Sequence, residues 1–136
     1  MIVVDSNIIG SLFLTSDRSP QAEQAFRKDP QWIAPFHWRS EIRNLLAFYI
    51  RKGILSLGDS QQILDAATEL MQGQEYEVAS HLILSLVATS TCSAYDCEFV
   101  ALAKDLHIHL VTVDKQILEQ FPDIAVSLEK FVSRRK

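Results

Sequence analysis

Four acidic residues stand where strand-like segments end or helical segments begin: Asp5, Glu41, Asp96 and Asp114. Asp5 follows the apolar run 2–4, and Asp114 follows the run 110–113. In open parallel α/β sheets, ligands bind in the crevice beyond the carboxyl ends of the strands. Carboxylate oxygens suit hard divalent cations, and a bound cation offsets the repulsion between clustered like charges. The pattern therefore predicts a site for Mg²⁺ or Mn²⁺. Two further side chains, Asn7 and Thr112, supply neutral oxygens that could hold water in the outer shell of the metal.

Each acid also has a purely structural explanation. Asp5 and Asp114 suit the N-cap positions of the helices that follow them. Asp96 would lie in the first turn of its helix, where the helix dipole favours a negative charge. Glu41 suits a solvated helix position, although it lies beside the apolar face of that helix. The joint placement of the four acids over the whole chain, at one end of the expected sheet, favours a shared site over four separate structural roles.

The length and composition are those of a globular domain. The chain has 136 residues, of which 48% are apolar and 22% charged, so residues 1–136 are expected to form one domain with a real core. No apolar run approaches the roughly 20 residues of a membrane span, and the N-terminus opens directly into a strand pattern. We therefore expect a cytoplasmic protein with no membrane partner. Cys92 and Cys97 are expected to be free thiols, and their spacing is poor evidence for zinc.

The charge balance is not that of a typical nucleic-acid binder. Thirteen Lys and Arg stand against 17 Asp and Glu, which gives a net charge of −4. This balance does not exclude a nuclease, because metal-loaded carboxylates become cationic and local basic patches can hold phosphates. The candidate patches are Arg39 with Arg43, Arg51 with Lys52, and the tail 134–136. Taken alone, each patch is ordinary solvated charge.

Apolar runs alternate with helical patterns along the chain. Strands are expected near 2–4, 31–34, 108–112 and 124–127, with a weak edge strand at 75–78. Helices are expected near 8–13, 19–28, 37–52, 57–72, 79–89, 95–106 and 115–120 and in the tail. Ser19 is the expected N-cap of the second helix, and Pro35 the stop of the second strand. This alternation predicts an α/β fold with three α/β/α layers around a mostly parallel central sheet.

Four segments carry a resemblance to a known family, and they are 2–8, 40–44, 94–103 and 110–115. The most specific are Tyr95-Asp96 with the following Ala-Leu-Ala, and Thr112-x-Asp114-Lys115. In this order they resemble the PIN domain, specifically the VapC-like toxin ribonucleases of type II toxin–antitoxin pairs. The resemblance covers nearly the whole chain, although 51–93 matches only as helical sequence. Cys97 departs from the usual Ala, and no further acid follows Asp114, which argues against a second tightly held metal.

The resemblance implies a function and a set of roles. Asp5, Glu41, Asp96 and Asp114 would be the catalytic, metal-binding acids, supported by Asn7 and Thr112. The chain would be a Mg²⁺- or Mn²⁺-dependent endoribonuclease, inhibited by a cognate antitoxin protein and acting as a homodimer. Wide apolar stripes on the helices near 38–50 and 63–71 agree with a dimer. Arg43 is a weak candidate for holding the RNA backbone.

Two other functions would need residues that this sequence lacks, and two further alternatives stay open. A receiver-type signalling domain would need an acid pair at the first strand and a phosphoacceptor at the third. An Asp-x-Asp phosphatase would need an acid where Asn7 stands. A catalytically silent PIN-like module that binds RNA or protein stays open, although the intact acidic quartet argues against it. His107 and His109 would share one face of a strand and could bind metal, a weaker alternative.

Overall fold

A computed structural model describes residues 1–134, so Arg135 and Lys136 of the basic tail lie outside the described residues. The elements in chain order are β1 (Ile2–Val4), α1 (Ser6–Phe13), α2 (Ser19–Lys28), β2 (Trp32–Pro35), α3 (Trp38–Arg51), α4 (Leu57–Leu70), β3 (Glu75–Tyr76), α5 (Ser80–Ala88), α6 (Ala94–Leu106), β4 (Leu110–Thr112), α7 (Lys115–Gln120), β5 (Ala125–Ser127) and α8 (Leu128–Ser133). Within residues 1–134, no helix is both long and apolar enough to cross a membrane.

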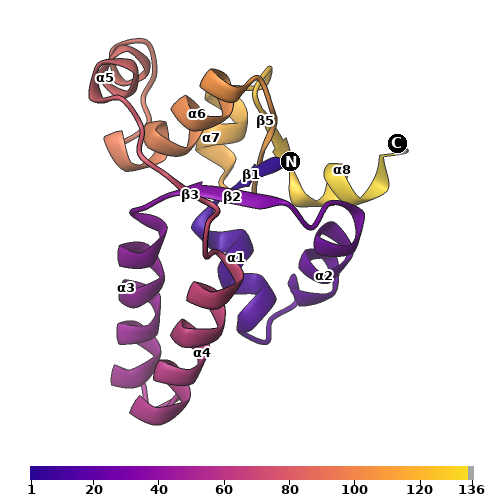
Figure 1. The fold of residues 1–136 in the computed structure, drawn as a ribbon, viewed down its shortest axis with the longest axis vertical. Coiled ribbons are helices and arrows are strands. Elements are labelled where there is room, and N and C mark those ends of the chain that lie inside the picture. Colours follow the sequence, from indigo (N-terminus) through magenta and orange to yellow (C-terminus); the bar gives the residue numbers. More distant parts are fainter. Residues whose placement is uncertain (135–136) are drawn as a thin grey trace.

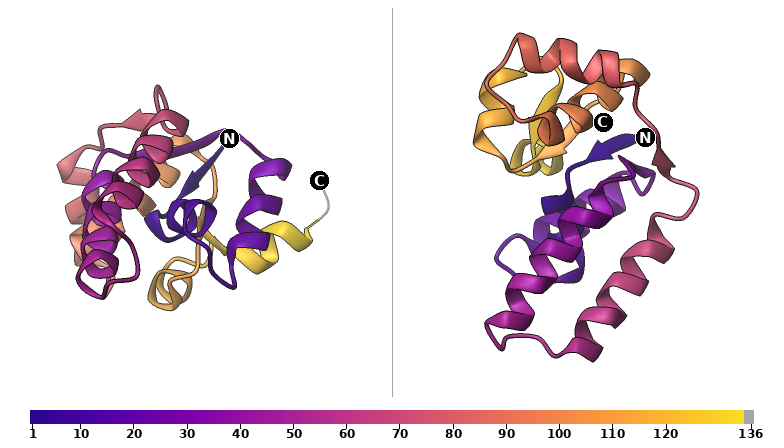
Figure 2. Two further views of the ribbon diagram at one scale, coloured as in Figure 1. Left: turned by 90° about the horizontal axis from the view of Figure 1, so that it is seen from below. Right: turned by 90° about the vertical axis from the view of Figure 1, so that its left-hand side faces the viewer.

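The strands form one five-stranded sheet in the order β3-β2-β1-β4-β5, and every pairing is parallel. Helices α1, α3 and α4 lie on one side of the sheet, and α5 and α6 lie on the other (Figure 1). The α3–α4 pair extends away from the sheet in the right-hand view of Figure 2. The predicted three-layer α/β/α fold is confirmed, because each apolar strand is covered on both faces.

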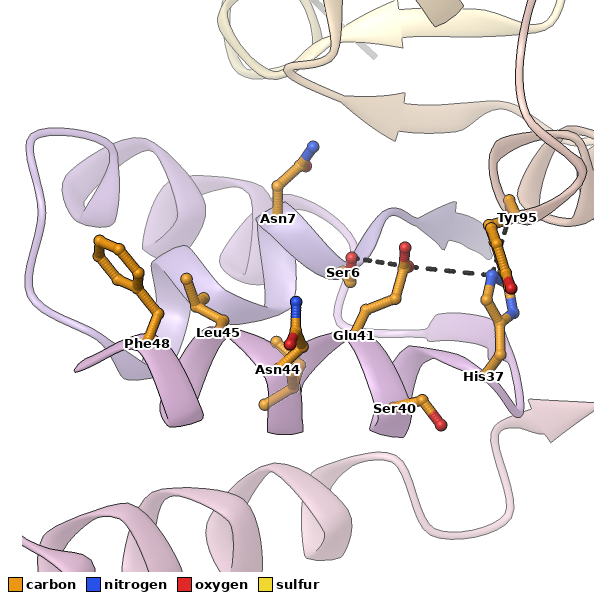
Figure 3. A pocket seen from close by; sticks show the side chains of 10 residues that line it. Ser6, Asn7, His37, Ser40, Glu41, Asn44, Leu45, Phe48 and Tyr95 are labelled. Carbon is orange, nitrogen blue, oxygen red and sulfur yellow. Dashed lines mark hydrogen bonds and ion pairs between the residues drawn. The ribbon is translucent and has the colours of Figure 1, made fainter. Parts of the chain in front are cut away.

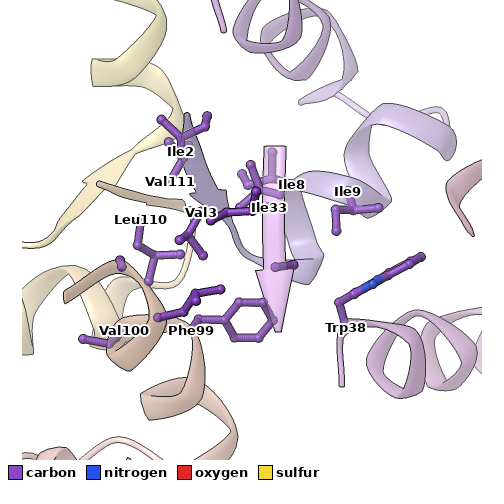
Figure 4. Close-up of a cluster of buried hydrophobic side chains, with 14 of the residues drawn as sticks. Ile2, Val3, Ile8, Ile9, Ile33, Trp38, Phe99, Val100, Leu110 and Val111 are labelled. Carbon is purple, nitrogen blue, oxygen red and sulfur yellow. The ribbon is translucent and has the colours of Figure 1, made fainter. Parts of the chain in front are cut away.

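The core forms where α1 and α6 pack on the central strand β1 and its neighbours β2 and β4. Ile2, Val3 and Val111 on the strands are at most 4% exposed, and Phe99 of α6 and Ile8 of α1 are fully buried. Figure 4 shows these side chains meeting around β1 and β2. The burial of both sheet faces explains why the strand sequences are continuous apolar runs.

The path of the chain creates a switch point beside β1. From β1 the chain passes to β2 and β3 on one side and then returns to β4 on the other. Val4 pairs in register with Val111, and the Asp5 N–H donates to the Val111 carbonyl at 3.0 Å. Asp5 thus directly follows β1, and Thr112 is the last residue of the adjacent strand β4. A crevice at the carboxyl ends of such strands is the expected ligand position.

Several element ends differ from the prediction, for example that of the edge strand, which ends at Tyr76 and not at 78. The fourth strand is shorter at its start, because His107 adopts a left-handed conformation (φ 56°) that ends α6 and leaves Ile108 bonded to the Ala103 carbonyl. Ile124 belongs to a turn, since its N–H donates to Phe121. Pro35 is the last residue of β2 and does not stop it, because a strand end tolerates a missing N–H.

The predicted N-cap at Ser19 is wrong, because Arg18 precedes α2 as its cap residue. The Ser19 hydroxyl bonds instead to the carbonyls of Ser11 and Leu14, at 2.7 and 2.9 Å. It therefore ties the end of α1 to the start of α2. Proline stands at the second helical position, where its missing N–H costs nothing.

An ion pair fixes the start of α3 on the short edge strand β3. Glu75 has a side chain only 7% exposed, and it accepts hydrogen bonds from Arg39 Nε at 2.6 Å and Trp38 Nε1 at 2.8 Å. A second Arg39 nitrogen contacts the other carboxylate oxygen, so the pair is bidentate. This contact lowers the pKa of Glu75. Arg39 is therefore engaged in the fold and is not a free phosphate ligand.

We expect Arg39→Ala to lower the free energy of unfolding by about 1–2 kcal/mol, because it leaves a buried carboxylate without its cation. In a Glu75→Gln background, Arg39→Ala should lower the free energy of unfolding clearly less, since no buried charge is left without a partner. Urea unfolding of the four proteins measures both values, with Arg43→Ala on the same helix as the control. An equal cost in both backgrounds would contradict this role of the ion pair.

Candidate metal centre

Asp5 occupies the N-cap position of α1, yet its side chain makes no capping bond. Its Oδ2 accepts from the Thr112 hydroxyl at 2.7 Å and from Asn7 Nδ2 at 3.3 Å. The Asp5 side chain is thus held between the ends of β1 and β4 and is only 5% exposed. A capping role does not explain this carboxylate.

Ser6 connects Asp5 to Glu41 and was not singled out from the sequence. Its hydroxyl lies 2.9 Å from Glu41 Oε1 and 3.3 Å from Asp5 Oδ1. A hydroxyl carries one proton, so it donates to one carboxylate at a time, and the Glu41 contact is the shorter. Glu41 reaches this position from the first turn of α3. The structure therefore brings Asp5 and Glu41 to one serine.

Asp96 and Asp114 approach from the starts of two other helices. Ser93 caps α6 by accepting from the Asp96 N–H at 3.1 Å, which leaves the Asp96 carboxylate out of the cap. Asp114 does cap α7, since its Oδ1 accepts from the Ile117 N–H at 3.0 Å. Its own N–H donates to Thr112 Oγ1 at 3.0 Å, so Thr112 links Asp5 to Asp114. The structural explanation holds in part for Asp114.

Burial and mutual repulsion destabilise the ionised acids. Burial raises the pKa of Asp5 to about 6, with the Thr112 hydrogen bond opposing the shift and the charges of Glu41 and Asp114 adding to it. Burial likewise raises the pKa of Glu41 and of Asp96, and neighbouring acids raise both further. Each of the four predicted acids thus acts electrostatically on at least one of the others.

The donor set fits a hard divalent cation. Within residues 1–134, no Lys or Arg lies within ion-pair distance of the four acids. Asn7 Oδ1 is buried without a hydrogen-bond partner, so a neutral oxygen is left unused beside Asp5. In the same described part of the chain, no three acidic, His or Cys side chains form a ready-made metal cage. Carboxylates and an amide oxygen suit Mg²⁺ or Mn²⁺, but the acids must draw closer to bind one directly.

A groove of about 830 Å³ opens beside these acids along α3. It is lined by Ser6, Asn7, His37, Ser40, Glu41, Ile42, Asn44, Leu45, Phe48 and Tyr95. Figure 3 shows Ser6, Glu41 and His37 in a row, with Tyr95 beside the imidazole. A chain-like substrate could therefore lie along α3 and reach the acids at one end of the groove.

His37 is a second site residue that the sequence analysis missed. Its Nε2 lies 3.8 Å from Glu41 Oε1, and its Nδ1 lies 3.2 Å from Glu98 Oε2. The latter is an ion-pair distance without hydrogen-bond geometry, so Nδ1 has no hydrogen-bond partner. The four-residue spacing of His37 and Glu41 was a usable signal, because such side chains are neighbours on a helix. The contact to Glu98 had no local signal.

The remaining candidates lie apart from the acids. Arg43 is exposed, does not line the groove, and bonds the Arg39 carbonyl and the Ser40 hydroxyl at 3.2 Å each. His107 and His109 precede β4, so the premise that they share a strand face is wrong. Cys92 and Cys97 are free thiols, as expected, and both are buried.

Comparison with known proteins decides the family. A family model described as PIN domain matches residues 2–124. This chain belongs to the PIN domain family. It is 27% identical to Ribonuclease VapC3 of Pyrobaculum aerophilum over 124 residues, which are 89% of this chain and 95% of that protein.

Two solved structures share the PIN-like fold of this chain. The crystal structure of PAE2754 from Pyrobaculum aerophilum matches with a TM-score of 0.77 and 16% identity, over 96% of this chain and 92% of that one. FitAcB from Neisseria gonorrhoeae matches with a TM-score of 0.70 and 16% identity, over 93% and 96% of the two chains. The family inferred from the motifs is thus confirmed, while the metal-binding role of the four acids stays a prediction.

The raised pKa of Asp5 predicts how the stability of this PIN domain depends on pH. Between its ordinary value of 3.8 and about 6, the folded state holds a proton that the unfolded chain releases. The stabilisation contributed by this proton is therefore fully present below pH 3.8 and is lost as the pH rises through 6, by about 3 kcal/mol in all. Asp5→Asn should remove this loss, because asparagine has no charge to bury.

We expect the free energy of unfolding of Asp5→Asn to exceed that of the wild type by about 2–3 kcal/mol at pH 8 in EDTA, and to equal it below pH 4. Urea unfolding across this pH range measures the effect. The control is Asp105→Asn, an exposed acid of α6 that should shift stability by less than about 0.5 kcal/mol. An Asp5→Asn protein no more stable than the wild type at pH 8 would count against the assigned shift.

Proposed function

We propose that this PIN-domain protein is a Mg²⁺- or Mn²⁺-dependent endoribonuclease that hydrolyses RNA phosphodiester bonds. The observation that carries the proposal is the partly buried, mutually repelling set of acids at the β1–β4 switch point, in which Asp5 is buried. These acids lie beside an open groove and have no Lys or Arg partner in residues 1–134. The 27% identical relative is named a ribonuclease, which supports the same activity here.

Each acid has a proposed role that follows from its position. Asp5 and Asp96 would be the principal metal ligands, and Asp114 would bind directly or through water. Glu41 would bind the metal or orient the attacking water, since Ser6 aims its carboxylate toward Asp5. A metal bound there would lower the pKa of a water molecule and neutralise charge that develops on the phosphate.

Two neutral side chains support the acids. Thr112 holds the Asp5 carboxylate in one orientation through its 2.7 Å hydrogen bond. Asn7 offers its unpaired Oδ1 to water or metal on the same side. Such outer contacts fix the ligands that they touch, and their loss costs about 10–100-fold in metal affinity or activity. Arg43 is a weaker candidate for holding the RNA backbone, because it is exposed on α3 but does not line the groove.

The mechanism predicts that Asp5→Asn abolishes cleavage while the protein stays folded. The expected loss is at least about 100-fold, the upper end for outer-shell changes, since a direct ligand is removed at nearly constant volume. Wild type, Asp5→Asn and the control Asp105→Asn are assayed on a structured RNA with Mg²⁺, Mn²⁺, Ca²⁺ or EDTA. Ca²⁺ should not support cleavage, because its looser coordination positions water and phosphate less accurately.

Cleavage that survives EDTA, or equal activity of wild type and Asp5→Asn, would exclude this mechanism. RNA binding by both proteins without cleavage would favour the alternative of a catalytically silent PIN-like binding module.

We also propose that the protein is a cytoplasmic homodimer held by a cognate antitoxin, as the VapC-like resemblance implies. Exposed apolar side chains on and beside the α3–α4 pair support a protein contact, since Phe48, Ile54 and Leu57 are 52–64% exposed. Light scattering at micromolar concentration should give twice the monomer mass of 15.4 kDa. The product of a neighbouring small gene should form a complex and suppress cleavage. A monomer unaffected by that product would contradict this proposal.

A further inference from the structure

We propose that His37 is a positioning residue for Glu41, which holds that carboxylate toward the acidic cluster and thereby sets the affinity of the site for a divalent metal. The inference rests on the proposed metal site and adds a residue that neither the motifs nor the family assignment supplies. It concerns a contact between two helices on opposite sides of the sheet.

The imidazole of His37 is enclosed by polar and aromatic groups. Its side chain is 15% exposed and stacks at a tilt on Phe99, with ring centroids 4.7 Å apart. Its Nε2 lies 3.0 Å from the Tyr95 carbonyl and 3.8 Å from Glu41 Oε1. On the other edge of the ring, Nδ1 lies 3.2 Å from Glu98 Oε2. A side chain with contacts on all these sides has little freedom to rotate away from Glu41.

This histidine joins elements that otherwise pack elsewhere. Helix α3 packs mainly on α1 and α4, whereas α6 packs on α5 and the strands from the opposite side of the sheet (Figure 1). His37 precedes α3, while Tyr95, Glu98 and Phe99 all belong to the first two turns of α6. The imidazole therefore fixes how far the start of α3 lies from the start of α6. Glu41 and Asp96 sit on those same two helix starts, so this separation is also the one between two proposed metal ligands.

Glu41 is held from two directions. Ser6 of α1 donates to Oε1 from one side, and His37 faces the same oxygen from the other, as the dashed lines in Figure 3 mark. All groups that face the two imidazole nitrogens are oxygens that accept, namely two carboxylates and a carbonyl. Of these groups, the Tyr95 carbonyl is at hydrogen-bond distance from Nε2, while the carboxylates of Glu41 and Glu98 lie on either side of the ring. In the proposal, the imidazole between them limits the repulsion of these two carboxylates, which would otherwise move α3 away from α6.

The test measures Mn²⁺ binding directly, by titration calorimetry and by the electron paramagnetic resonance signal of free Mn²⁺. We expect His37→Ala to weaken binding about 10-fold, as removal of an outer-shell partner does. His37→Gln places an amide nitrogen where Nε2 stood and should recover most of the affinity. His37→Asn places one where Nδ1 stood, keeps the Glu98 side, and should recover little. A merely structural histidine would not separate the two amides in this order.

A second comparison asks whether His37 acts through Glu41. In a Glu41→Gln background, His37→Ala should have almost no further effect on Mn²⁺ affinity, because residues that act as one unit are not additive. His81→Ala, an exposed histidine of α5, is the matched control and should bind like the wild type. Circular dichroism establishes that each variant is folded, and His37→Gln and His37→Asn carry the test if His37→Ala is not.

Two outcomes would overturn the inference alone while leaving the proposed function intact. One is wild-type Mn²⁺ affinity in His37→Ala and His37→Asn. The other is an equal loss from His37→Ala in the wild-type and Glu41→Gln backgrounds. If the wild type binds no Mn²⁺ at all, the metal site itself fails, and this inference fails with it. That result is separable from the first two, because it is read on the unmodified protein.

Discussion

The burial of one carboxylate constrains much of this structure. Asp5 ends the central strand β1, and the strands and helices that pack around it leave its side chain 5% exposed among other acids. An ionised group in that position is costly unless hydrogen bonds or a cation compensate it. The structure supplies hydrogen bonds to Asp5 from Thr112 and Asn7. Among residues 1–134, no Lys or Arg lies within ion-pair distance of its carboxylate. The compensation is partial, which is why the pKa of Asp5 stays above its ordinary range.

The parallel topology makes this arrangement possible. Every strand of the sheet points the same way, so the carboxyl ends of β1 and β4 meet at one edge, and the register Val4 to Val111 brings Asp5 beside Thr112. Helices that start at this edge turn their first residues toward it, as α6 and α7 do with Asp96 and Asp114. The four acids are far apart in sequence, and they influence one another's pKa because strand ends and helix starts share one edge.

Local patterns were enough to predict most of the fold. The run 2–4 and its acid gave β1 and Asp5 because both signals are local, and the layer arrangement followed from the alternation of strands and helices. The fourth strand was predicted too long, since nothing in the apolar pattern of 108–113 reports that His107 closes the preceding helix in a left-handed turn. Asp114 was predicted as either a cap or a site acid, and the structure has it capping α7 with one oxygen while its charge acts on Asp5.

The contacts of Ser6 and Glu98 were missed because they depend on an approach between helices that no local spacing encodes. Ser6 gains its role because α3 brings Glu41 to it, and Glu98 gains its role because α6 brings it to His37. These contacts involve carboxylates, as the burial of Asp5 does, and they bear on the repulsion among the acids. Protons and a divalent cation compete for carboxylates whose pKa is raised, so the affinity of such a site for metal depends on how closely the acids are held together. With no ready-made cage in residues 1–134, the contacts that set the distance between α3 and α6 help to decide whether the repelling acids can close around a cation.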